Sequence, residues 1–293
     1  MSIKKYRALL ETIESGSLTR AAEKLNYTQP GISHMILSLE DEFGFPLLIR
    51  GKNGVTPTAE AEKLLAYVRQ IVNGEQKLRE EVGRIHGADV GTIRIGCFFS
   101  LSIHFLPSIV AEFTELHPGV ELQLYVGEHG EICQWLHQGK IDLAFMSLPV
   151  PGEFDFVPLF DDPIYAVLPE GHILAKRERI NPKELLEYPF ILQQQGSDED
   201  ANRVFEGEGL TPKVRFRVRG DEAIQSMIAK GLGVSLVPEL VLSRRPQGLI
   251  LRPLEPEYHR VLGIALPGGE RAPALKRLLD FVEDYCARAG NRA

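Results

Sequence analysis

Helix stop and start signals in the first 58 residues constrain this chain more than any other feature. Apolar residues recur at helical spacing over 6–13, then Gly16 is placed to end that helix and Ser17 to cap a second one. Thr28 can cap a third helix, whose first turn holds Pro30 at a position where a missing N–H costs nothing. Two short helices joined by so tight a turn predict a helix-turn-helix unit.

A hairpin signal follows the third helix. The strand-forming run 47–50 leads into Asn53-Gly54, and Asn-Gly is the strongest short hairpin signal. We therefore expect a small β-wing at the end of an otherwise all-α domain that spans residues 1–58.

A long helix is expected within residues 59–88. Its apolar residues form one stripe with an alternating spacing of four and three, which only Glu75 interrupts. The stripe consists of Leu64, Val68, Ile71, Leu78, Val82 and Ile85. A sustained period of 3.5 residues favours pairing with a second copy of the helix, that is, a homodimer. Packing of the stripe on its own domain is the alternative.

After a glycine-containing joint at 87–91, strand patterns alternate with helical ones. The expected strands cover 92–96, 120–126, 141–146, 164–168, 190–193, 214–218 and 234–237. This alternation predicts an α/β domain over 89–293 with largely parallel sheets and two Rossmann-like lobes. Lobe 1 is expected to hold residues 91–161 and 268–293, and lobe 2 residues 162–267. The last helix, 272–287, would return to lobe 1.

Length and composition agree with two or more folded domains. The chain has 293 residues, of which 44% are hydrophobic and 25% charged, so disorder, collagen-like repeats and a coiled coil along the whole length are excluded. The net charge of −7 falls entirely in residues 91–293, while residues 1–58 carry +1. Any contact with nucleic acid must therefore use a local, oriented surface rather than bulk charge.

The chain carries no signal for a membrane or for export. No apolar run approaches the ~18 residues of a membrane helix, and the basic N-terminal residues lack a following apolar segment. The three cysteines Cys97, Cys133 and Cys286 are odd in number and widely spaced, which fits neither a disulfide framework nor a zinc site. A reducing cytoplasm is the expected location.

Many residues at fixed spacing resemble one known family. In the N-terminal part they are Gly16 to Leu25, Thr28 to Ser33, Leu39-Glu40, Phe43-Gly44, Leu47-Leu48 and Arg50. In the C-terminal part they are Arg94 to Gly96, Leu106-Pro107, Phe113, Pro118 to Val120, Gly139, Asp142 to Ala144, and Gly231 to Val234 with Pro238. With these residues the chain resembles the LysR-type transcriptional regulators over nearly its whole length.

The resemblance implies a winged helix-turn-helix domain, a dimerising linker helix, and two lobes like those of periplasmic solute-binding proteins. It implies promoter DNA as a partner, assembly as a homodimer or homotetramer, and a small-molecule effector of unknown identity instead of a cofactor or metal. RNA polymerase is a further partner that the resemblance leaves open. Effector binding would change the angle between the lobes, and the linker helices would pass that change to the DNA-binding domains.

The polar residues of the first domain can be sorted by the DNA group that they would contact. Gln29, Ser33 and His34 lie at the start of the third helix, where side chains reach base edges, and the Gln29 carboxamide can pair bidentately with adenine. Phosphate contacts are expected from Ser17, Thr19, Thr28 and Arg50, and further DNA contacts from Arg20, Pro30, Lys52 and Asn53. An ordinary helix cap or a solvated side chain is the alternative for each polar residue. The low charge of residues 1–58 predicts weak non-specific binding.

An effector should lie between the lobes, outside the carboxyl ends of their strands. The expected lining is Phe98, Phe99, Ser100, Leu101, Glu128, Ser147, Leu148, Gln194, Gln195, Gly196, Ser197 and Glu222. Ser100 precedes a helix expected over 102–116, so its hydroxyl and the first N–H groups of that helix would bind a carboxylate. The alternatives are a simple cap for Ser100, ordinary loop polarity for the other polar residues, and core packing for the two phenylalanines.

The charge of these loops bears on the effector. They contain no lysine or arginine, which favours a neutral, zwitterionic or aromatic effector over a multiply charged acid. Cys97, next to the cleft, is either a thiol sensor or a buried inert thiol.

Catalytic patterns are missing from the sequence. It contains no Gly-x-Ser-x-Gly elbow, no phosphate-binding loop and no His-Glu-x-x-His, and its eight histidines are scattered, so we do not expect an enzyme. Two rival interpretations remain. The C-terminal half alone would fit the solute-binding module of a transport system, and the whole chain would fit a cytoplasmic enzyme with an interaction domain.

Overall fold

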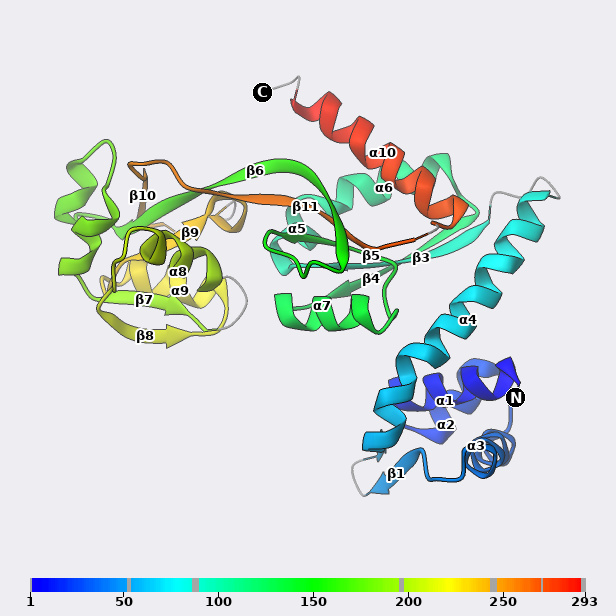
Figure 1. The fold of residues 1–293 in the computed structure, drawn as a ribbon. Helices are drawn as coiled ribbons and strands as arrows, with labels where there is room; N and C mark the ends of the chain where they lie inside the picture. Colours follow the sequence, from blue (N-terminus) through cyan, green and yellow to red (C-terminus); the bar gives the residue numbers. More distant parts are fainter. Residues whose placement is uncertain are drawn as a thin grey trace.

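The structure, a computed structural model, describes residues 2–51, 54–85, 90–194, 198–242, 247–269 and 271–290. In chain order it has a small helical domain, one long helix and two α/β lobes that lie side by side (Figure 1). The predicted fold class, a winged helix-turn-helix domain followed by two α/β lobes, is confirmed.

The N-terminal domain forms from the predicted signals. Its elements are α1 (Ile3–Ser15), α2 (Leu18–Leu25), α3 (Gln29–Phe43), β1 (Leu48–Gly51) and β2 (Gly54–Pro57). Gly16 ends α1 with φ of 62°, and its carbonyl accepts a hydrogen bond from the N–H of Val55 in the wing (2.9 Å). A Cβ on Gly54 would lie 2.7 Å from that same carbonyl, so close approach of the wing to the end of α1 requires glycine at 54.

The linker helix α4 (Ala59–Ile85) starts where Thr58 caps it, since the Thr58 hydroxyl accepts from the N–H of Ala61 (3.1 Å). Its first turns pack on α1 and the wing, and Ala61 and Val68 are buried in the core of the N-terminal domain. The prediction that Val68 faces a second copy of the chain is therefore wrong. Helical spacing identifies the apolar face of a helix but does not say what covers it.

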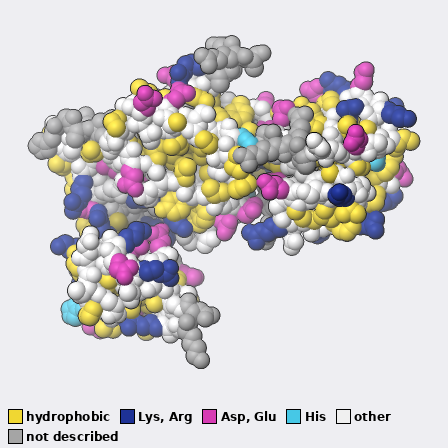
Figure 2. All heavy atoms as spheres, turned by 180° about the vertical axis from the view of Figure 1, so that it is seen from behind, with side chains coloured by type: hydrophobic (Ala, Val, Ile, Leu, Met, Phe, Trp, Pro, Cys, Tyr) yellow, Lys and Arg dark blue, Asp and Glu magenta, His cyan; other side chains and the backbone are white. Residues whose placement is uncertain are grey.

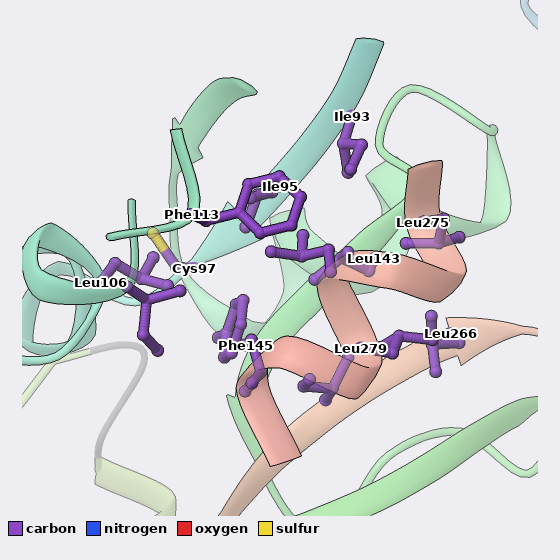
Figure 3. Packing of buried hydrophobic residues seen from close by; sticks show 14 of the residues in the cluster. Ile93, Ile95, Cys97, Leu106, Phe113, Leu143, Phe145, Leu266, Leu275 and Leu279 are labelled. Atoms are coloured by element: carbon purple, nitrogen blue, oxygen red, sulfur yellow. The ribbon is translucent and has the colours of Figure 1, made fainter. Parts of the chain in front are cut away.

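Lobe 1 is built on three neighbouring strands with helices on both sides. Its elements are β3 (Gly91–Cys97), α5 (Phe99–His104), α6 (Leu106–Leu116), β4 (Val120–Val126), α7 (His129–His137), β5 (Leu143–Ser147) and the C-terminal helix α10 (Pro273–Gly290). Strand β3 pairs in parallel with β4 and β5. Leu275 and Leu279 of α10 pack against side chains of β3 and β5 (Figure 3), so the last helix returns to lobe 1.

Two long strands, β6 (Phe154–Pro169) and β11 (His259–Pro267), run through both lobes (Figure 1). The sheet order is β10-β6-β11-β5-β3-β4, with β9 also paired to β6. Both crossing strands pair antiparallel with each other and with their other neighbours. The expected largely parallel arrangement is wrong for these pairs. The chain passes from lobe 1 to lobe 2 along β6 and returns along β11, so these two neighbouring strands run in opposite directions.

Lobe 2 surrounds the far ends of these strands. Its elements are the 3-10 helices η1 (Ile173–Lys176), η2 (Pro182–Glu187) and η3 (Glu239–Leu242), the strands β7 (Phe190–Gln193), β8 (Val214–Val218), β9 (Ser235–Pro238) and β10 (Leu249–Pro253), and the helices α8 (Asp198–Gly207) and α9 (Asp221–Ala229). Phe190 and Phe205 pack edge to face in its core, with ring centroids 5.2 Å apart.

Strand β11 enters lobe 1 earlier than predicted. Leu262, Ile264 and Leu266 are buried in the core of lobe 1, and residues 262–265 pair with β5. The expectation that residues up to 267 belong to lobe 2 is wrong. Pro267-Gly268-Gly269 ends a strand, and the change of lobe occurs inside that strand, where no turn residue marks it.

Polar contacts attach α4 to lobe 1. The Asn73 amide donates to the Gly139 carbonyl (2.9 Å), and the Arg94 guanidinium donates to Asn73 (3.2 Å) and to Gln76 (2.6 Å). Seen from behind, the N-terminal domain is a separate body below lobe 1 (Figure 2). The linker helix is therefore the part of the chain that joins that domain to the lobes.

Candidate DNA interface and effector cleft

The start of α3 forms an exposed polar face. The Thr28 hydroxyl accepts from the N–H of Gly31 (3.3 Å), and Pro30 stands in the first turn. Gln29 and His34 are exposed, while Ile32, one residue before Ser33, is fully buried. Core packing of the inner face of α3 therefore fixes which residues point outward.

The wing joins this face. Arg50 of β1 is exposed, and its Nη2 donates to the Ser33 hydroxyl (3.4 Å). Leu37, one turn further along α3, is 50% exposed. An exposed apolar residue at this place can contact a thymine methyl group.

The start of α2 holds two of the predicted phosphate-binding residues, Ser17 and Thr19, together with Arg20, which was predicted as a further DNA contact. Ser17 caps the helix by accepting from the N–H of Arg20 (3.4 Å), and the side chains of Thr19 and Arg20 are exposed. Lys52 and Asn53, at the tip of the wing, lie outside the described residues.

The predicted stripe on α4 divides into two parts. Leu64 is half-buried and Val68 is in the core of the N-terminal domain, whereas Ile71, Leu78, Val82 and Ile85 are all at least 45% exposed. Glu75, which interrupts the stripe, pairs with Arg7 of α1 and with Arg79. The second half of the helix therefore presents an apolar face that none of the described residues of this chain covers.

A cavity of about 580 Å³ lies between the lobes. The structure brings six of the predicted effector residues to its wall: Phe98, Phe99, Ser100, Glu128, Ser147 and Glu222. They come from the carboxyl ends of β3, β4, β5 and β8, as expected for a ligand site in an α/β fold.

Other predicted effector residues lie elsewhere. Leu101 is 1% exposed in the core of lobe 1, the Leu148 carbonyl accepts from Arg203, and the Gln194 side chain is exposed outside the cavity wall. Gln195, Gly196 and Ser197 are outside the described residues.

Ser100 does not precede its helix as predicted. It lies inside α5, whose N-cap is Phe98, and Pro107 starts a separate helix, α6. The expected 102–116 helix is therefore two helices, and Ser100 contributes a side-chain hydroxyl to the cavity rather than a cap. Proline at the start of α6 favours this break because its ring is compatible only with the first turn of a helix.

No local sequence pattern marks the ionic cluster at the cavity wall, which is formed by the buried Asp162, Asp200 and Arg260 and the partly exposed Arg203. Arg260 of β11 is 3% exposed, and it donates to Asp162 of β6 through Nε (2.8 Å) and to Asp200 of α8 through Nη1 (3.2 Å). Its Nη2 lies 2.8 Å from the same Asp162 oxygen in a direction that does not complete a hydrogen bond. Arg203 donates to Asp200 (2.6 Å) and to the Leu148 carbonyl of lobe 1. The cluster thus connects both lobes where the strands cross.

This cluster corrects the predicted charge of the site. The expectation that no arginine faces the effector is wrong, because Arg219 and Arg260 both line the cavity. Arg260 is far from the predicted loops in sequence. Only the pairing of β11 with β6, which places Arg260 opposite Asp162, brings it to the cavity.

Carboxylates on lobe 2 dominate the electrostatics. Burial raises the pKa of Asp200, although Arg260 and Arg203 oppose the shift, and burial likewise raises the pKa of Asp221. Asp221 and Glu222 open α9 directly after Gly220. Glu222 was predicted as a polar residue that follows a strand end, and the same rule would also predict Asp221.

The Cys97 thiol lies in the core of lobe 1 and does not line the cavity. Cys97 is fully buried, and burial raises the pKa of its thiol to about 12, so it stays protonated at neutral pH. Within the described ranges, no group of three His, Cys, Asp or Glu side chains could hold a metal ion. None of the described helices is both long enough and apolar enough to cross a membrane.

Family comparisons match both halves of the chain. Residues 3–62 match the bacterial regulatory helix-turn-helix protein, lysR family, and residues 86–287 match the LysR substrate binding domain. The chain belongs to the LysR family of transcriptional regulators. This LysR-type regulator is thus a DNA-binding protein with an effector-binding domain, and the predicted family and function are confirmed.

Individual relatives align over the whole length. The regulator is 31% identical over 286 residues to YvbU of Bacillus subtilis, an uncharacterized HTH-type transcriptional regulator, with 97% of each chain covered. It is 30% identical to LrrA of Synechococcus elongatus, a probable HTH-type transcriptional regulator, with 96% of each covered. A full-length OxyR variant from Pseudomonas aeruginosa has the same fold, with a TM-score of 0.80 at 23% identity over 98% of this chain and 94% of that one.

Proposed function

We propose that this regulator binds promoter DNA as a cytoplasmic homo-oligomer through α3 and the wing, and that a small molecule in the cavity between the lobes changes this binding. The observation that carries the proposal is the outward polar face formed by the exposed Gln29, His34 and Arg50 and the half-buried Ser33, whose hydroxyl accepts a hydrogen bond from Arg50 across the two elements. Such a face suits a helix in the major groove and a wing beside it.

Each residue of this face has a separate task. Gln29 reads a base through its carboxamide, and Ser33, His34 and Leu37 contact neighbouring base edges. Thr28 and Pro30 set the start of α3. Arg50, together with Ser17, Thr19 and Arg20 at the start of α2, contacts phosphates, and this fixes the register of the protein on the duplex.

Replacement of Gln29 tests the assignment of the reading helix. Gln29→Ala should weaken binding to the specific operator by about 1–3 kcal/mol and leave non-specific binding unchanged, because a base contact is lost and no charge is removed. Genome-wide footprinting would first define the operator, and fluorescence anisotropy at two salt concentrations would then give both affinities.

Gln134→Ala on α7, which is exposed and far from α3, is the matched control and should change neither affinity. Equal losses on specific and non-specific DNA would show that Gln29 does not read a base. A salt slope near zero for the wild type would contradict DNA binding through phosphates.

The uncovered stripe of α4 supports a homodimer. Ile71, Leu78, Val82 and Ile85 follow a coiled-coil spacing, and their exposure in one chain leaves them free for the same residues of a second copy. A two-fold pair would place two α3 helices for the two halves of a partly palindromic operator. The family resemblance implies a homodimer or homotetramer and leaves contact with RNA polymerase open.

A charge in the stripe tests the dimer. Leu78→Lys should weaken dimer formation at least 100-fold, because two copies of a leucine lose their apolar partner and two positive charges face each other. Light scattering across a dilution series measures the change. Glu62→Lys is the control. Glu62 lies about 160° from Leu78 around the same helix, because each α-helical residue advances by about 100°. A dimer unchanged in Leu78→Lys would refute the assignment.

The cavity supports control by a small molecule rather than catalysis. Its volume lies in the range of ligand sites, and residues of both lobes line it. The relatives reported above are regulators, and we propose no catalytic role for this chain.

A further inference from the structure

The two walls of the cavity differ in chemistry. On lobe 1, Ser100 and Ser147 are 7% and 4% exposed and line the cavity. Neither hydroxyl donates a hydrogen bond to any described residue, and neither oxygen belongs to the fully buried atoms that lack a partner, so both hydroxyls open onto the cavity. Both are therefore available to donate to a bound molecule.

The lobe 2 wall is anionic. Among the described lining residues, lobe 2 contributes three carboxylates, Asp200, Asp221 and Glu222, and the guanidinium of Arg219, while Arg260 comes from the crossing strand β11. Arg260 is already shared between Asp162 and Asp200, and Asp200 also holds Arg203, so that buried cluster balances its own charge. Asp221 and Glu222 have no lysine or arginine within ion-pair distance among the residues that the structure describes.

On lobe 1 the carboxylates have local partners. Glu128 and Glu131 form a capping box at the start of α7, where each accepts from a backbone N–H of the other residue. Their charge still opposes a second anion near the serines. Phe99, which lines the cavity, is 58% exposed, and an exposed aromatic face attracts cations.

We infer that the cavity takes a small organic cation, an amine or guanidinium compound whose positive end lies against Asp221 and Glu222 and whose far end carries a neutral oxygen that accepts from Ser100 and Ser147. This inference rests on the proposed effector role of the cavity. Because the two ends bind different lobes, such a ligand stabilises one separation of the lobes over others, which is the requirement for a switch. It agrees with the sequence-based expectation that the effector is not a multiply charged acid, but it replaces the expected neutral or zwitterionic effector with one that carries a net positive charge.

Three probes of equal chain length test the charge. 5-Amino-1-pentanol is a cation with a hydroxyl, 5-aminovalerate is a zwitterion and glutarate is a dianion. Isothermal titration of the full-length protein at millimolar probe concentrations should give affinities in that order. Equal binding, the reverse order, or no binding of the amino alcohol would overturn the inference.

Variants locate the binding. Asp221→Asn and Glu222→Gln should each weaken the amino alcohol about tenfold, the loss expected for one charge-assisted hydrogen bond. Ser147→Ala should weaken it severalfold. Glu222→Lys should reverse the order so that glutarate binds best. Glu206→Gln, an exposed carboxylate on α8 outside the cavity, is the control and should change nothing. Amino alcohol affinity that is unaffected by Asp221→Asn and Glu222→Gln would overturn the inference.

A second readout separates this inference from the proposed function. If the ligand class is wrong but the function is right, anionic probes will bind in the cavity and alter operator affinity. If the function is wrong, the amino alcohol will bind with the expected variant effects and leave operator affinity unchanged.

Discussion

The junction between the two lobes and the junction between α4 and lobe 1 are both held by arginine, but in different surroundings. Arg260 is 3% exposed and lies between two carboxylates that are equally buried. Arg94 is 19% exposed and bonds mainly to the amides of Asn73 and Gln76, with Asp142 3.6 Å away.

The difference shows how each junction can move. A buried ion pair cannot be opened without leaving a charge in an apolar environment, so the Arg260 cluster holds the crossing strands rigid at their centre. Amide contacts near solvent are readily exchanged for water, so the angle between α4 and lobe 1 can change at low cost. The junction between the lobes is therefore rigid, and the junction between α4 and lobe 1 is the one whose angle changes more easily.

Replacement of the buried arginine gives the largest expected effect. Arg260→Met should lower the free energy of unfolding of the lobes by about 3–5 kcal/mol, because Asp162 and Asp200 stay buried without their common partner. Urea denaturation of the full-length protein measures the loss. Arg217→Met on the exposed face of β8 is the control and should cost less than about 0.5 kcal/mol.

The same substitution at the linker junction should cost less. Arg94→Met removes half-buried hydrogen bonds and should lower stability by about 1–2 kcal/mol. It should also change the separation between the DNA-binding domain and the lobes in small-angle scattering. A loss as large as that of Arg260→Met would contradict the contrast between the two junctions.

The smallest effect concerns Asp221 and has the opposite sign. Burial raises the pKa of Asp221 above its ordinary 3.8, so the folded state binds more protons than the unfolded state between those two values. Stability is therefore lost as pH rises through the folded pKa. Asp221→Asn removes this penalty and should stabilise the unliganded protein at pH 7 by up to about 1 kcal/mol.

Thermal unfolding at several pH values checks this sign. The variant and the wild type should converge below about pH 3, where Asp221 is protonated in both states. A variant that is less stable at neutral pH would show that the Asp221 carboxylate supports the fold, which would remove Asp221 from the proposed cation site.

Local signals were sufficient for the DNA-binding domain. Gly16, Ser17, Thr28 and Pro30 act where they stand in the sequence, because capping and helix termination depend on neighbours within a few residues. The helical spacing of the buried residues of α3 then determines that Gln29 and His34 face outward. The exposed part of the α4 stripe was likewise visible from its spacing, but the role of Val68 was not.

The cavity was only half predictable. Residues that follow strand ends, such as Ser147 and Glu222, could be assigned from the α/β pattern because strand ends gather at one edge of a sheet. Arg260 could not, since its position depends on a strand that returns from the C-terminal part of the chain and pairs with residues almost a hundred positions earlier.

The sequence by itself determined the helix-turn-helix, the long linker helix, the α/β class of the lobes and the family, because these depend on spacing within short segments. Only the tertiary structure decided where β11 changes lobes, which part of α4 is covered, and that a balanced ionic cluster lies beside an anionic cavity wall. Those features depend on contacts between distant segments, and local periodicity contains no information about which segments meet.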